Sequence, residues 1–221
     1  MARSISLFLS YVFMPLLIPT LIFLFLVFNA PAGEYLGIAN KLLIVAMVFS
    51  CTFLIPVLSL FALKITRSIA SWHMGTKEER VFPFSAISLF YLLTTYMFYI
   101  KLNAEPIYLL TLGTISACLI LLTAITFFWK ISAHMTGIAG FLAIVVVMGL
   151  KFPTVNAFPF IIICLIATGL VGSARLYLNA HRPQEVWAGF FLGFSAPGRP
   201  AGRCPCRAGG RGRRRAPRPH G

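Results

Sequence analysis

Residues 107–129 read IYLLTLGTISACLILLTAITFFW, a run of twenty-three residues without a charged side chain. An α-helix rises about 1.5 Å per residue, so about 20 such residues cross the ~30 Å hydrocarbon core of a bilayer. A helix that faced water on one side would carry charged residues there, and this run carries none. Inside lipid, backbone amides must bond within their own segment. The run therefore predicts a transmembrane helix.

Apolar runs of similar length recur along the chain of 221 residues, which is 59% hydrophobic and 11% charged with a mean hydropathy of +0.88. Soluble domains carry about 25% charged residues. We predict an all-α, polytopic transmembrane bundle of six to seven spans, whose last span is truncated. It would be a multi-pass integral protein of a bacterial inner or plasma membrane. The predicted spans are residues 5–29, 41–63, 84–101, 107–129, 133–150 and 157–178, and a seventh begins near residue 184.

Prolines fall inside two of these spans, namely Pro15 and Pro19 in the first and Pro56 in the second. Neighbouring helices can satisfy the backbone groups that a proline leaves unbonded in a membrane. We expect these spans to continue through their prolines with a kink.

The last residues differ from the rest of the chain. Residues 196–221 read APGRPAGRCPCRAGGRGRRRAPRPHG, with eight arginines and no acid. Such a segment buries too little apolar surface to order itself. We interpret it as the product of a reading-frame shift near Ser195, because residues encoded by GC-rich codons begin abruptly there. The alternative is a polybasic tether for anionic lipid or nucleic acid. The chain thus divides into 1–63 (N-terminal helices), 64–195 (core) and 196–221 (disordered tail).

The connections after even-numbered spans carry most of the polar residues. Counting Arg3, that face of the membrane holds eight lysines and arginines against three on the other. The positive-inside rule makes this face cytoplasmic. Four of these eight residues are candidates for a binding site, and without them the two faces differ by a single basic residue. The positive-inside rule therefore favours a cytoplasmic location for this face but does not establish it.

The chain has no aspartate, and its only acids are five glutamates. Sites for two magnesium ions are built from clustered carboxylates, which this composition cannot supply. The cysteines lack the paired spacing of zinc sites. We expect no metal and no cofactor.

Three clusters of basic and histidine residues lie at connections on the same face. One holds Arg175, His181 and Glu185, and the second holds Ser132 and His134. The third holds Lys77 and Arg80. Arginine and lysine neutralise oxyanions, and helix N-termini favour them. Two histidines allow one to act as nucleophile and the other as acid near neutral pH.

These clusters resemble the motifs of the type 2 phosphatidic acid phosphatase superfamily, which are membrane lipid phosphatases related to vanadium haloperoxidases. Its third motif, S-R-x5-H-x3-D, is similar to Arg175-x5-His181-x3-Glu185, with Ala174 in place of serine and glutamate in place of aspartate. Its second, P-S-G-H, is similar to residues 131–134, ISAH. Its first, K-x6-R-P, shares residue types with Lys77, Arg80 and Pro83 at a different spacing. The resemblance covers roughly residues 64–195.

The resemblance implies a metal-independent phosphatase or phosphotransferase. In that mechanism His181 accepts the phosphoryl group as phosphohistidine, Glu185 orients its ring, and His134 protonates the leaving alcohol. Arg175, Ser132 and Lys77 or Arg80 would bind the phosphate. The substrate would be a lipid phosphate, such as phosphatidic acid or phosphatidylglycerol phosphate, or a polyprenyl pyrophosphate. We expect membrane lipids and no specific nucleic acid as partners.

Two other interpretations remain open from sequence. The departures at Ala174, at Glu185 and in the first motif also suit a non-catalytic lipid-binding or transport protein with a phosphatase-like basic pocket. Alternatively, the arginine-rich tail is the functional part, and its removal would then abolish function.

Overall fold

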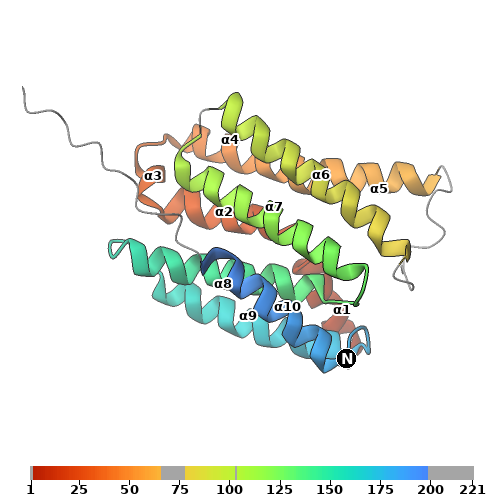
Figure 1. The fold of residues 1–221 in the computed structure, drawn as a ribbon. Coiled ribbons are helices and arrows are strands. Elements are labelled where there is room, and N and C mark those ends of the chain that lie inside the picture. The colour runs from red at the N-terminus through yellow and green to blue at the C-terminus, as the bar shows by residue number, and fades with distance from the viewer. Residues whose placement is uncertain (1, 66–77, 103, 199–221) are drawn as a thin grey trace, which may run out of the picture.

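The computed structural model describes residues 2–65, 78–102 and 104–198, and it is helical throughout its described elements. Figure 1 shows a bundle of roughly parallel and antiparallel helices. The elements are α1 Ala2–Val12, α2 Ile18–Asn29, α3 Pro31–Glu34, α4 Ile38–Phe49, the π-helical η1 Ser50–Leu54, α5 Ile55–Ile65, α6 Glu78–Ile100, α7 Pro106–Thr126, α8 Ala133–Lys151, α9 Phe158–Tyr177, α10 Pro183–Ser195 and the 3₁₀ turn η2 Ala196–Gly198.

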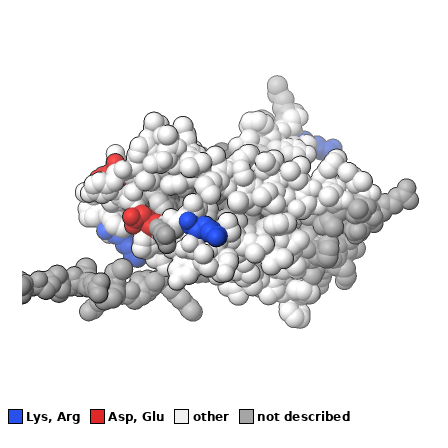
Figure 2. Space-filling view, turned by 90° about the horizontal axis from the view of Figure 1, so that it is seen from above, with Lys and Arg blue, Asp and Glu red and all other residues white. Residues whose placement is uncertain are grey.

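The predicted all-α transmembrane architecture is confirmed. Within the described residues, five helical segments are long and apolar enough to cross a membrane: Ile38–Ala62, Pro83–Ile100, Pro106–Thr126, Ala133–Lys151 and Phe158–Tyr177. They lie close to five of the predicted spans. Many large apolar side chains on them are exposed, and the surface between the two ends of the molecule is nearly free of charge in the view of Figure 2. Both features fit a multi-pass integral membrane protein.

The first predicted span, 5–29, is wrong as a single helix, because α1 ends at Val12 and α2 begins at Ile18. Pro15 has no amide hydrogen to bond to the Tyr11 carbonyl, and its ring disfavours a helical residue before it. That carbonyl instead accepts the amide of Met14 in a tighter turn, at 3.3 Å. With 11 and 12 residues, α1 and α2 are each too short to cross a bilayer alone.

The second span does continue through its proline. A segment of π-helix, η1, joins α4 to α5 just before Pro56. In an α-helix the amide missing at Pro56 would have bonded to the carbonyl of Thr52. The hydroxyl of Tyr91 in α6 donates to that carbonyl at 3.3 Å. A neighbouring helix thus satisfies the group that the proline leaves unbonded, as membrane burial requires.

Helix α10 is short, and its 13 residues span about 20 Å at 1.5 Å per residue. This length agrees with the prediction that the last span is truncated. Residues 196–198, which the sequence places in the disordered tail, instead form η2 and contact α7 and α8. The chain after Gly198 lies outside the described residues.

The most extensive helix contact in the described fold is between α8 and α10. Gly189 and Gly193 face α8 one turn apart, the small-xxx-small spacing that lets membrane helices approach closely. A Cβ at Gly189 would lie 2.7 Å from the Ser132 carbonyl oxygen, and a Cβ at Gly193 would overlap the carbonyl of Thr136. These glycines set the distance between the two helices.

We expect Gly193→Ala to destabilise the protein by about 1–3 kcal/mol, because the added methyl forces the two backbones apart. Gly169→Ala is the matched control, since a Cβ at Gly169 in α9 would have no neighbour within 4 Å. Thermal unfolding in detergent measures both variants. Equal midpoints would show that the contact between α8 and α10 is looser than described.

Candidate functional site

The cluster of Arg175, His181 and Glu185 lies on the connection between α9 and α10, whose geometry follows from its caps. Asn179 adopts a left-handed conformation with φ of 49°, which asparagine tolerates better than most residues. The amide of Ala180 then donates to the carbonyl of Arg175 at 3.2 Å, and the amide of Asn179 to that of Leu176 at 3.0 Å. This pair of bonds ends α9 and turns the chain toward Pro183, where α10 begins. His181 is held in the turn between the two helices.

His181 and Glu185 form a buried pair. The Nδ1 atom of His181 lies 2.8 Å from Oε2 of Glu185, and both residues are 8% exposed. A carboxylate accepts hydrogen bonds, so Nδ1 of His181 donates to it, and in the neutral tautomer of the ring the lone pair lies at Nε2. The same carboxylate oxygen accepts the backbone amide of Arg182 at 3.2 Å. Glu185 therefore caps α10 and orients the imidazole at once.

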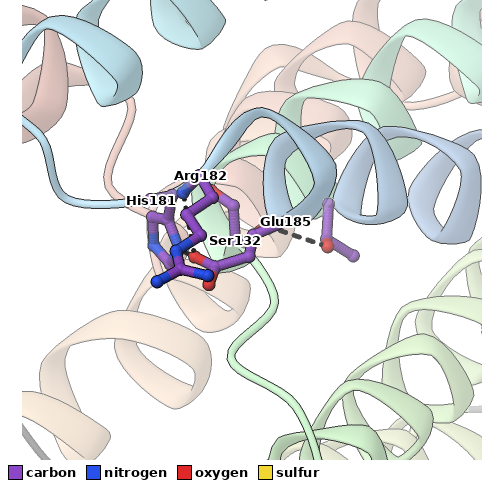
Figure 3. A network of polar contacts seen from close by, with 5 residues as sticks. Ser132, His181, Arg182 and Glu185 are labelled. Carbon is purple, nitrogen blue, oxygen red and sulfur yellow. Dashed lines mark hydrogen bonds and ion pairs between the residues drawn. The ribbon is translucent and has the colours of Figure 1, made fainter.

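Ser132 joins this connection to the start of α8. Its backbone amide donates to the carbonyl of Glu185 at 3.2 Å, and the residue is 0% exposed. Figure 3 shows Ser132 beside His181, Arg182 and Glu185, where the chain before α8 meets the first turn of α10. Among the described residues the hydroxyl of Ser132 has no hydrogen-bond partner, and Ser132 does not line the cavity described below. The structure thus places it behind the site rather than within it.

His134 is the second residue of α8 and is partly buried. Its Nε2 lies 3.2 Å from the carbonyl oxygen of Ser10 in α1. A carbonyl only accepts, so Nε2 carries the proton of this hydrogen bond and Nδ1 is the nitrogen that can gain or lose one. Arg175 and His181 both lie close enough to interact electrostatically with the His134 ring.

One cavity of about 360 Å³ connects these residues. His134, Arg175 and His181, from α8, α9 and the turn after α9, all line it. Most of its remaining wall is apolar and comes from α2, α5, α6, α7, α8, α10, η2 and the segment that joins α1 to α2. The cavity has a basic end with two imidazoles and a guanidinium, and an apolar interior.

The remaining cluster from the sequence, Lys77 and Arg80, has no side chain that the structure describes. Lys77 and the side chain of Arg80 lie outside the described residues, so their assignment to the phosphate stays a prediction. Arg182 is exposed at the start of α10. Two groups that position the histidines were not predicted from the sequence, namely Asn179 and the carbonyl of Ser10. Asparagine shortly before a proline that opens a helix was a usable signal for the first, whereas a backbone carbonyl leaves no signal in sequence.

Comparison of the chain with protein-family models, curated proteins and solved structures gives no match. The functional argument therefore depends on the residues and on their geometry.

We expect Glu185→Ala to destabilise the protein by about 1–3 kcal/mol, because it leaves the His181 ring and the Arg182 amide without their acceptor. The neighbouring Gln184 is exposed, so Gln184→Ala should be within about 0.5 kcal/mol of the parent. Thermal unfolding of both variants in the same detergent tests this. A Glu185 variant as stable as the Gln184 variant would contradict the buried pair.

Proposed function

We propose that the chain is a metal-independent lipid phosphate phosphatase or phosphotransferase, which works through a phosphohistidine on His181 at a membrane interface. The observation that carries the proposal is the shared cavity, because His134, Arg175 and His181 come from different helical segments and line one space with an apolar interior. The resemblance to type 2 phosphatidic acid phosphatases, based on the spacing of two motifs, supports it independently. A bacterial inner or plasma membrane is the location that we propose.

In the first step Nε2 of His181 attacks the phosphorus, and the bond from phosphorus to the leaving oxygen breaks. Nδ1 of His134 donates a proton to that oxygen and releases the lipid alcohol. The contact of His181 with Glu185 stabilises the positive charge that forms on the ring. Arg175 neutralises the charge that develops on the other phosphate oxygens.

In the second step water attacks the phosphorus while His134 takes up the water's proton. The bond from phosphorus to nitrogen breaks, the electron pair returns to Nε2 of His181, and inorganic phosphate leaves. An alcohol in place of water would give a phosphotransferase. At the end of the second step His134 has regained its proton and His181 its lone pair, so water is the only co-reactant that the cycle needs.

We expect His181→Ala to abolish release of phosphate from a lipid phosphate, and His134→Ala to lower kcat by about 10²–10⁴-fold, the usual contribution of a general acid. Gln184→Ala is the control for the folded state and should keep parental activity. The measurement is phosphate release by purified protein in nanodiscs. Undiminished turnover by the His181 variant would rule out this mechanism.

The same assay should continue in EDTA and should fall with vanadate, a phosphate mimic that binds where the phosphoryl group is transferred. Loss of activity in EDTA that added divalent cation restores would overturn the metal-independent chemistry.

One observation favours a second candidate, a non-catalytic lipid-binding or transport protein. Ser132, which the resemblance assigns to the phosphate, is buried and does not line the cavity. Trapping of acid-labile phosphohistidine with radiolabelled substrate separates the two candidates. Lipid phosphate binding without any labelled protein would favour the non-catalytic one.

A further inference from the structure

Helix α1 turns its large apolar side chains outward. Leu7, Phe8 and Tyr11 share one side of the helix and form what we call the α1 stripe, in which Phe8 is 67% and Tyr11 73% exposed. The opposite side packs against α9 and carries Ser6, which is buried, and Ser10, which is half-buried. A helix that faces water has the reverse arrangement, with its polar side outward.

The end of α1 lies level with the first turn of α8. The carbonyl of Ser10, in the last turn of α1, meets His134, the second residue of α8. One turn further along α8, a Cβ at Gly137 would lie 3.1 Å from Cγ1 of Ile18, the first residue of α2. Figure 1 places α1 at the same end of the bundle as the start of α10. Because α8 is a candidate membrane span that begins at Ala133, α1 lies at the surface of the bilayer.

The break after α1 makes the orientation of His134 depend on this helix. In a continuous α-helix the carbonyl of Ser10 would accept the amide of Met14, but that amide donates to the carbonyl of Tyr11 at 3.3 Å. The ring of His134 donates to the Ser10 carbonyl instead, at 3.2 Å. Carbonyls at the C-terminal end of a helix carry partial negative charge and attract such donors. The last turn of α1 therefore fixes the ring.

We propose that α1 is an interfacial helix whose stripe inserts into the leaflet at the basic end of the bundle, and that this insertion holds the Ser10 carbonyl against His134. The partner is the boundary between lipid head groups and acyl chains, where amphipathic helices bury their apolar face about 5–10 Å deep. Arg3, exposed at the start of α1, complements anionic head groups there. The insertion goes beyond the proposed function, whereas its effect on turnover rests on that function.

The depth of the stripe is measured with Phe8→Trp in the full chain, reconstituted into liposomes. Their lipids carry bromine, which quenches tryptophan on contact, either near the carbonyl or near the methyl end of the acyl chain. The parent, with its three tryptophans, is subtracted. We expect at least about twofold stronger quenching by the shallow bromine. Ile166→Trp is the matched control, because Ile166 is exposed near the middle of α9 and should show the opposite preference.

The link to the ring is tested by the double substitution Phe8→Ser and Tyr11→Ser. Nuclear magnetic resonance of isotope-labelled histidine at alkaline pH, assigned with His134→Gln, reports which ring nitrogen carries the proton. We expect Nε2 in the parent and a mixture of tautomers in the variant, with phosphate release about tenfold slower. The control is Phe158→Ser with Tyr35→Ser, at least as exposed and at the other end of the bundle, which should keep the parental tautomer and rate.

Each readout can overturn a separate part of the proposal. Absence of quenching, as expected if a second copy of the chain covered the stripe, or quenching that favours the deep bromine would overturn the interfacial insertion. A parental tautomer in the double variant would overturn the link to His134. Absence of phosphate release from any lipid by the parent would overturn the proposed function alone, because quenching and tautomer are measured without turnover.

Discussion

The close contact between α8 and α10 is the constraint on which the rest of the site depends. Gly189 and Gly193 let the α10 backbone approach the carbonyls of Ser132 and Thr136. Because α10 begins directly after the turn that carries His181, this contact fixes the position of that imidazole relative to the start of α8. Small residues serve this purpose well in a bilayer, where no hydrophobic driving force holds helices together.

The long apolar runs made the spans predictable, since length and lack of charge decide a transmembrane helix with little help from packing. Their bounds in the structure lie close to the predicted ones. Pro15 and Pro56 had opposite outcomes that sequence did not distinguish. At Pro56 the helix continues, because the hydroxyl of Tyr91 in α6 donates to the Thr52 carbonyl that the proline leaves unbonded. At Pro15 the helix ends.

The grouping of His134, Arg175 and His181 was predictable from topology, because connections after alternate spans lie on one face of a membrane. Their detailed surroundings were not. The position of Ser132 depends on how closely α10 approaches, and the shape of the cavity depends on side chains from several helices. Such contacts are set by three-dimensional packing, and a single sequence does not encode them in any local pattern.

The hydrogen bond from His134 to the Ser10 carbonyl crosses the division drawn from sequence between an N-terminal region and a core. The ring that would handle the leaving group is thus oriented by a helix outside the stretch that resembles lipid phosphatases. A graft of residues 64–195 onto another membrane anchor would carry the histidines but lose this support. Modular exchange of the first helices should therefore change the orientation of the His134 ring as well as the anchoring in the membrane.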